Sequence, residues 1–328
     1  MAYAKINSVT DANMAKIFNV AKAGFGKIAG ADAPDSDTSF TFTMNTENAG
    51  SASDTFVLPL VDDGTINIDV DWGDSSTDNI TAYDQAEITH VYSSAGTYTV
   101  QMSGTIRGFT FNNSGDKLKI LNISQWGDFN VTRASAFMGC NNLDCSATDA
   151  PTVSTDPTAM FYWANNLTNI GGDWDMSGVT SLYLCFYQAA AFNGASLDSW
   201  DTSSVTNMNG VFRRAPAFNA DISAWDTSSV TNMSNMFDGW GPVGSFNQDL
   251  SSWDISGVTT FGTNFMRVQT LSTAIYDEIL LAWADQDVQS DLSVNFGNST
   301  YTAGAAEAAR TSLIDNDSWT ITDGGAAG

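Results

Sequence analysis

The 328-residue chain is poor in the residue types from which most catalytic and metal centres are built. It has three cysteines and one histidine, and its 12 Lys and Arg stand against 37 Asp and Glu, a formal net charge of −25 at pH 7. So acidic a chain repels phosphate groups, which argues against nucleic acid as a partner. Cys140, Cys145 and Cys185 are odd in number and have no zinc-site spacing, so we expect buried free thiols and no disulfide framework.

The sequence motifs of common enzymes are also absent. There is no P-loop, no G-x-G-x-x-G after a strand, no H-E-x-x-H and no G-x-S-x-G nucleophile elbow. A Ser-His-Asp triad would have to use His90, which stands inside a strand pattern. We therefore expect a protein that is not an enzyme and needs no cofactor. Its 43% hydrophobic content is enough to build the cores of two or three modules.

A repeated segment is the most informative feature that the chain does contain. The nine residues from Trp200, WDTSSVTNM, recur from Trp225, and looser copies begin at Trp174 and Trp253. The four tryptophans are 26, 25 and 28 residues apart, a period typical of units that bury their apolar faces against neighbouring copies. We expect these tryptophans to form the structural core of the repeats.

The apolar spacing inside each repeat predicts a strand, a tight turn and a short helix. Trp200 and Thr202 alternate as residues of a strand do, whereas Val205, Met208 and Phe212 stand at i, i+3 and i+7, on one face of a helix. Weaker copies extend the pattern upstream. They raise the number of coils to about six over residues 113–268.

The block W-D-x-S-x-V-T-x-M, followed by a phenylalanine and an F-N turn, resembles the BspA-like leucine-rich repeats of bacterial surface proteins. This resemblance covers about half of the chain and implies a leucine-rich-repeat-type solenoid. Residues 269–328 resemble the closing module of the same family. Helical spacing from Ile275 to Trp283 and from Ala305 to Ile314 predicts that this stretch is an α-helical cap.

Residues 35–112 have a different pattern, one of alternation with period two over residues 66–72, with further strands expected at 88–92 and 98–102. The sequence D-W-G-D at Asp71 to Asp74 and the series H-x-Y-x-x-x-G-x-Y-x-V from His90 resemble PKD domains, which are extracellular immunoglobulin-like spacers. Ser75 stands where that family commonly has glycine. The resemblance implies a small β-sandwich and, with the repeats, a mixed β/α fold.

Three aspartates of this segment, Asp69, Asp71 and Asp74, are weak candidates for calcium ligands, because Ca²⁺ binds carboxylate oxygens. The alternative is that they accept hydrogen bonds from turn backbone, which is the more common role of Asp after a strand. We favour the structural role.

Residues 1–34 differ from the remainder in charge. The first thirty residues sum to +3, whereas the rest of the chain sums to −28. An apolar stripe with helical spacing and lysines roughly opposite it predicts an amphipathic anchor segment. The residues assigned to this assembly anchor are Lys5, Met14, Lys16, Ile17, Phe18 and Phe25. A helix lying on a membrane is the alternative, but the stripe is short and has no tryptophan.

Two arginines and an insert are candidate ligand contacts. Arg213 and Arg214 are adjacent on a strongly acidic chain, and Trp240 lies in an insert that lengthens the last repeat. Loops on a rigid scaffold are frequent binding positions. The alternative is that the arginines only offset neighbouring aspartates.

The modules predict display outside a cell, yet the first eight residues have no apolar signal segment and the chain has no transmembrane run. A phage virion protein satisfies both observations, because it is made in the cytoplasm and meets the outside after lysis. Residues 5–22 also resemble the N-terminus of some phage structural proteins.

We therefore expect a non-enzymatic protein of the phage particle surface: a tail fibre, receptor-binding or capsid-decoration component. Its N-terminus would attach to other virion proteins in an oligomeric assembly without membrane insertion, and its repeats would recognise a host surface glycan or protein. One alternative is a bacterial cell-surface adhesin exported without a Sec signal. Another is a purely structural head-decoration protein.

Overall fold

The computed structural model describes residues 38–239 and 244–328. These residues belong to one compact unit, Pro34–Gly328. The predicted anchor, residues 1–34, lies outside the described residues.

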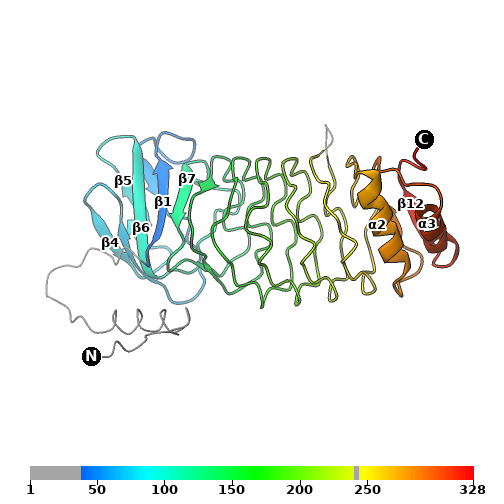
Figure 1. Cartoon of the computed structure of the whole chain (residues 1–328). Coiled ribbons are helices and arrows are strands. Elements are labelled where there is room, and N and C mark those ends of the chain that lie inside the picture. Colours follow the sequence, from blue (N-terminus) through cyan, green and yellow to red (C-terminus); the bar gives the residue numbers. More distant parts are fainter. Residues whose placement is uncertain (1–37, 240–243) are drawn as a thin grey trace, which may run out of the picture. The chain divides into compact units, whose positions relative to one another are not determined.

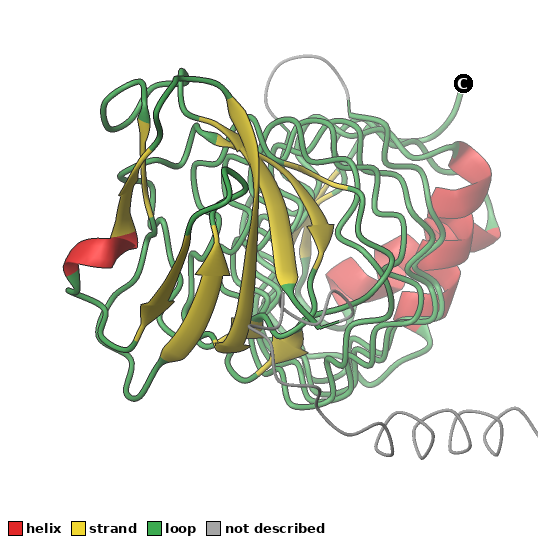
Figure 2. Ribbon diagram, turned by 90° about the vertical axis from the view of Figure 1, so that its left-hand side faces the viewer, coloured by secondary structure: helices red, strands yellow, loops and turns green. Residues whose placement is uncertain are grey.

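The first described elements form an open sheet, with six strands in the order β4-β3-β6-β1-β7-β9. Their bounds are β1 Phe40–Asn45, β3 Asn67–Asp71, β4 Thr77–Ile80, β6 Thr97–Thr105, β7 Ile120–Gln125 and β9 Asp144–Cys145. A separate two-stranded sheet joins β2, Thr55–Val57, to β5, Thr89–Val91, which follows the 3-10 helix η1, Ala86–Ile88 (Figure 2).

The prediction of an immunoglobulin-like sandwich was wrong, because the large sheet continues into the repeats. Strand β1 lies between β6 and β7, both antiparallel to it, and β7 then pairs in parallel with β9. Residue 112 was the predicted boundary between the sandwich and the repeats, yet strands from both sides of it share one sheet. A separate sandwich domain would end at that boundary. Two further short strands, β8 Asn130–Val131 and β10 Thr152–Val153, pair in parallel beyond it.

The repeats follow as similar loops that lie side by side between β7 and α2 (Figure 1). We call residues 154–272 the repeat array. Single parallel bridges connect its copies in register, from Ser181 to Asn207, from Asn207 to Asn232 and from Asn232 to Thr260. Within the described residues of this array there is neither an α-helix nor a strand of two or more residues.

The predicted strand–turn–helix coil, and with it the six-coil leucine-rich-repeat solenoid, was therefore wrong. The reason lies in the backbone amides. Those of Met208, Gly210, Phe212 and Arg214 donate to carbonyls of the next repeat at 2.8–3.0 Å, whereas a helix would bond each of them to the carbonyl four residues earlier. The i, i+3, i+7 spacing belongs to consecutive turns whose alternate amides connect neighbouring copies.

A ladder of parallel phenylalanine rings fills the interior of the array. Phe161, Phe186, Phe212 and Phe237 follow one another with centroids 5.6–6.0 Å apart and planes within 20°. The cores of the large sheet and of the array form one cluster of buried side chains. Offset ring packing of this kind stabilises the stack beyond area burial alone.

Two α-helices are present in the described residues, α2 Thr273–Ala284 and α3 Ala305–Asp315. Strands β11 Ser293–Asn295 and β12 Thr320–Thr322 pair in parallel. Helix α2 packs on the last repeat: the Trp283 ring lies 5.4 Å from that of Phe261, and Trp283 Nε1 donates to the Leu250 carbonyl at 3.2 Å. Neither helix has the length and apolar character needed to cross a bilayer.

Candidate functional site

The residues that directly follow the ladder phenylalanines, with Arg267 at the equivalent place in the last repeat, form a row along the repeat array. Backbone hydrogen bonds fix the row: Trp163 N donates to the Tyr187 carbonyl, Gln188 N to that of Arg213, and Arg214 N to that of Asp238. The same pattern continues from Gly239 to Arg267. We call the side chains of this row the aromatic–guanidinium edge; its members are Tyr162, Trp163, Tyr187, Gln188, Arg213, Arg214, Asp238 and Arg267.

The aromatic half of this edge is tightly packed. The rings of Tyr162 and Tyr187 stack with centroids 4.3 Å apart, and the Trp163 ring meets Tyr162 edge-on at 4.8 Å. Trp163 Nε1 donates to Gln188 Oε1, which fixes the amide of Gln188. Burial, together with the neighbouring Tyr187, raises the pKa of Tyr162, and the two arginines only partly offset this.

Two guanidinium groups lie on the same tyrosine. The guanidinium carbons of Arg213 and Arg214 are each 5.6 Å from the centroid of the Tyr187 ring, within the range of a cation–π interaction. The aromatic and cationic halves of the edge are therefore continuous at Tyr187.

A buried carboxylate anchors the cationic half. Asp238 is fully buried and accepts from Arg213 Nε at 2.8 Å and from Arg267 Nε at 2.9 Å. Two guanidinium groups thus share one carboxylate, and with Arg214 the edge carries three arginines and one aspartate. This local excess of positive charge lies on a chain whose net charge is −25.

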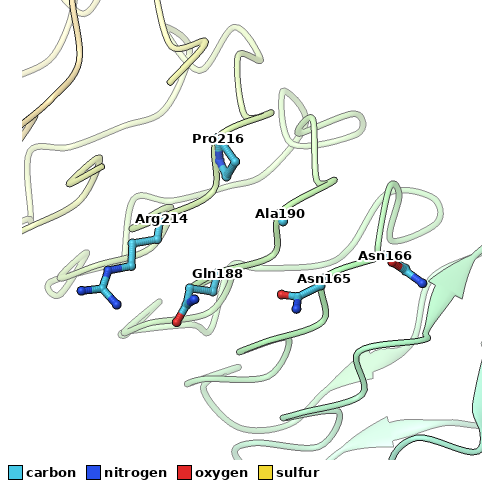
Figure 3. A pocket seen from close by; sticks show the side chains of 6 residues that line it. All are labelled: Asn165, Asn166, Gln188, Ala190, Arg214 and Pro216. Carbon is cyan, nitrogen blue, oxygen red and sulfur yellow. The ribbon is translucent and has the colours of Figure 1, made fainter. Parts of the chain in front are cut away.

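An open hollow of about 620 Å³ lies beside the edge, and Figure 3 shows the residues that line it. They are Asn165, Asn166, Gln188, Ala190, Arg214 and Pro216. Three amides and one guanidinium thus surround the hollow, with Ala190 and Pro216 as the small and apolar part. Amides both donate and accept hydrogen bonds, whereas a guanidinium only donates. The lining suits a ligand with many hydroxyls and an anionic group.

The ligand contacts predicted from the sequence differ in where the structure places them. Arg214 lines the hollow, whereas Arg213 forms an ion pair with the buried Asp238. Trp240 lies outside the described residues, as do the six residues assigned to the anchor. The four repeat tryptophans are all buried: Trp174, Trp200, Trp225 and Trp253.

Sequence reasoning missed Tyr162, Trp163, Tyr187 and Gln188. The signal that could have found them is positional, because each follows a ladder phenylalanine in the same place as Arg213 and Arg214. Comparison of that column between repeats would have placed two tyrosines beside the arginines.

The calcium candidates each accept a hydrogen bond from a nearby group. Asp71 accepts from Gly73 N at 2.9 Å, and Asp69 from Asn79 Nδ2 at 2.8 Å. Asp74 accepts from Ser76 N at 3.0 Å; burial opposes its ionisation, but the hydrogen bonds from Ser76 and His90 outweigh burial and lower its pKa. In residues 38–239 and 244–328 no group of three or more His, Cys, Asp or Glu side chains is arranged to hold a metal.

His90, Asp74 and Ser76 lie together without the geometry of a catalytic triad. His90 Nε2 is 3.0 Å from Asp74 Oδ2 and 3.4 Å from Ser76 Oγ, so both partners face the same ring nitrogen. A triad needs the carboxylate on the opposite nitrogen from the serine.

The cysteine thiols are a separate case. Burial raises the pKa of the Cys145 thiol to about 12, which keeps it protonated and unreactive at neutral pH.

Comparison with known families gives one match. The family model described as "Mycoplasma protein of unknown function, DUF285" matches residues 109–193 and 155–278, which together make up more than half of the chain. No curated protein and no solved structure matches the chain.

Proposed function

The chain belongs to the DUF285 family, which is associated with BspA-like surface repeat proteins of Mycoplasma, and from this premise we propose a non-enzymatic surface-recognition function. The single observation that carries the proposal is the aromatic–guanidinium edge with its adjoining hollow. Tyrosine, tryptophan and arginine are the residue types enriched at binding hot spots. Here they occupy one row on a rigid stack.

The proposed setting is the surface of a phage particle, with the repeats directed at the host. The charge segregation of residues 1–34 supports attachment to other virion proteins through that segment. The sheet before the repeats would act as a spacer between that segment and the repeat array. In support, its two sequence motifs contact each other and help to hold the sheet together: the Trp72 ring stacks on His90 at 4.6 Å, and Tyr92 Oη donates to the Trp72 carbonyl at 3.0 Å.

Antibodies raised against the folded chain test both the location and the role. We expect them to label intact phage particles and to reduce the adsorption of these particles to host cells. A chain that begins at Asp35 should keep the fold of the compact unit but fail to incorporate into particles. Labelling of bacterial cell surfaces in the absence of particles would favour the adhesin alternative instead. Labelling of particles without any effect on adsorption would favour a decoration protein.

A further inference from the structure

We propose that the hollow beside Arg214 binds an acidic saccharide, a sugar unit that carries a carboxylate or a sulfate group. This inference rests on the proposed recognition function and names the ligand class of its site. It combines three observations: the charge of the edge, the polar lining of the hollow and the size of the hollow.

The charge of the edge selects an anion. Arg213 and Arg267 share the single buried carboxylate of Asp238, and Arg214 lies directly on the hollow. A guanidinium presents a planar pair of donors that matches a carboxylate or sulfate. Within the repeat array the other charged side chains are mostly aspartates, so an anionic ligand finds a more favourable potential at this edge.

The lining selects a ligand with hydroxyl groups. Asn165, Asn166 and Gln188 place three amides around the hollow, and the hydrogen bond from Trp163 Nε1 holds the amide of Gln188 in place. Because each amide offers a donor and an acceptor, it can pair with sugar hydroxyls of either orientation. A preorganised amide loses little freedom when it binds.

The size selects a small molecule. A hollow of about 620 Å³ lies in the range of ordinary small-ligand sites, whereas a stable protein partner would need an interface of roughly 800 Å² on each side. The hollow spans three neighbouring copies of the repeat, two of which contribute Gln188 and Arg214 at equivalent positions.

The backbone conformation at Arg214 allows a substitution that removes the side chain without disturbing the fold. Gln188 and Arg214 have φ values of 55° and 59°, in the left-handed region that favours glycine, and Gly139 has the equivalent place in an earlier repeat with φ of 81°. This conformation recurs through the array, so it does not itself indicate a site. It means that Arg214→Gly removes the side chain while it relieves backbone strain. Val268, at the next such position but one, has φ of 74° and lies away from the hollow, so Val268→Gly is the matched control.

Calorimetric titration of the full chain with 3′-sialyllactose, 3′-sulfolactose and neutral lactose tests the proposal. We expect at least one acidic sugar to bind at least tenfold more tightly than lactose, and the two acidic probes distinguish carboxylate from sulfate recognition. Arg214→Gly should weaken that binding at least tenfold, whereas Val268→Gly should bind as the parent does. Thermal unfolding of each variant confirms that the fold is kept.

The inference is overturned if neither acidic sugar binds more tightly than lactose, or if Arg214→Gly binds as the parent does. Adsorption of the labelled chain to host cells, with and without the Arg214→Gly substitution, separates this failure from that of the proposed function. Cell adsorption that does not depend on Arg214 would leave the recognition function standing with a protein partner or a different site. Sugar binding by a chain that is absent from particle and cell surfaces would support the saccharide site and contradict the proposed surface-recognition function.

Discussion

The two edges of each repeat differ in what they keep constant. On one edge, which we call the tryptophan edge, the segments that begin at Trp174, Trp200, Trp225 and Trp253 keep nearly the same sequence. On the aromatic–guanidinium edge, equivalent positions differ between copies: they are Tyr162, Tyr187, Arg213, Asp238 and Arg267.

In its last two copies the tryptophan edge makes equivalent contacts between neighbouring repeats. Trp225 Nε1 donates to the Leu197 carbonyl at 2.8 Å and Trp253 Nε1 to that of Ile222 at 3.1 Å, in each case in the preceding repeat. After each tryptophan an aspartate accepts from the serine two residues later, as Asp226 does from Ser228 N at 3.0 Å. The comparison teaches that the tryptophan edge, or constant edge, holds the copies in register. This leaves the aromatic–guanidinium edge, or variable edge, able to vary in sequence and therefore in ligand.

The largest expected effect is on the constant edge. Trp225→Ala removes a ring that is 2% exposed, lies 6.1 Å from Trp200 and 5.9 Å from Phe212, and donates to Leu197. We expect it to lower the free energy of unfolding by about 3 to 5 kcal/mol. Urea unfolding followed by circular dichroism measures the loss.

The matched control is the same substitution on the variable edge. Trp163 is only half-buried, with the Tyr162 ring and the Gln188 amide as partners, so Trp163→Ala should cost about 1 kcal/mol. Equal losses for the two variants would mean that both edges hold the stack and that the comparison is wrong.

The second-largest expected effect tests whether charge, rather than packing, stabilises the variable edge. Asp238→Asn keeps the size of a buried side chain but removes the charge that Arg213 and Arg267 share. We expect a loss of about 1 to 2 kcal/mol, smaller than for a fully buried pair, because Arg213 and Arg267 are 28% and 42% exposed. Urea unfolding in low and in high salt measures this loss, which should shrink as salt screens the ion pairs.

The Trp225→Ala loss should be nearly independent of salt, since it comes from packing. If the Asp238→Asn loss were also independent of salt, the variable edge would be held by packing rather than by charge.

Much of the organisation of the chain was accessible from sequence because it depends on side-chain pattern. The period of the tryptophans gave the spacing of the repeats, and strands expected over residues 66–72 and 98–102 correspond to β3 and the middle of β6. Inward and outward alternation along a strand is a property of the residues themselves.

The coil structure was not accessible, because it depends on hydrogen-bond partners that are distant in sequence. Val205, Met208 and Phe212 have the spacing of a helical face, yet alternate amides from Met208 to Arg214 donate to the next repeat. No local pattern distinguishes these turns from a helix. For the same reason, the pairing of β1 with β7, which joins the large sheet to the repeats, could not be foreseen.

The smallest expected effect concerns the aspartates of the constant edge and their dependence on pH. Hydrogen bonds from the side chain and then the backbone of Ser228 lower the pKa of Asp226, and the pKa values of Asp175 and Asp201 are lowered in the same way by Ser177 and Ser203. A carboxyl with a lowered pKa in the folded state stabilises the fold above its unfolded value of about 3.9, and this contribution is lost as the pH falls through the folded value.

Asp226→Ala should therefore cost about 0.5 kcal/mol at pH 7, a small figure because the carboxylate is exposed to solvent. Since the parent loses the same contribution in acid, the difference between the two chains should shrink as the pH is lowered below about 4. Urea unfolding from pH 7 to pH 3 measures it. Asp226→Asn is the control, because its amide oxygen still accepts from Ser228 but does not titrate, so its stability relative to Asp226→Ala should not change with pH. A difference between parent and Asp226→Ala that stayed constant to pH 3 would mean that the contribution of Asp226 does not depend on its charge. No difference at any pH would mean that the turn is held by its backbone alone, and that the constant edge owes its register to the tryptophans rather than to the aspartates.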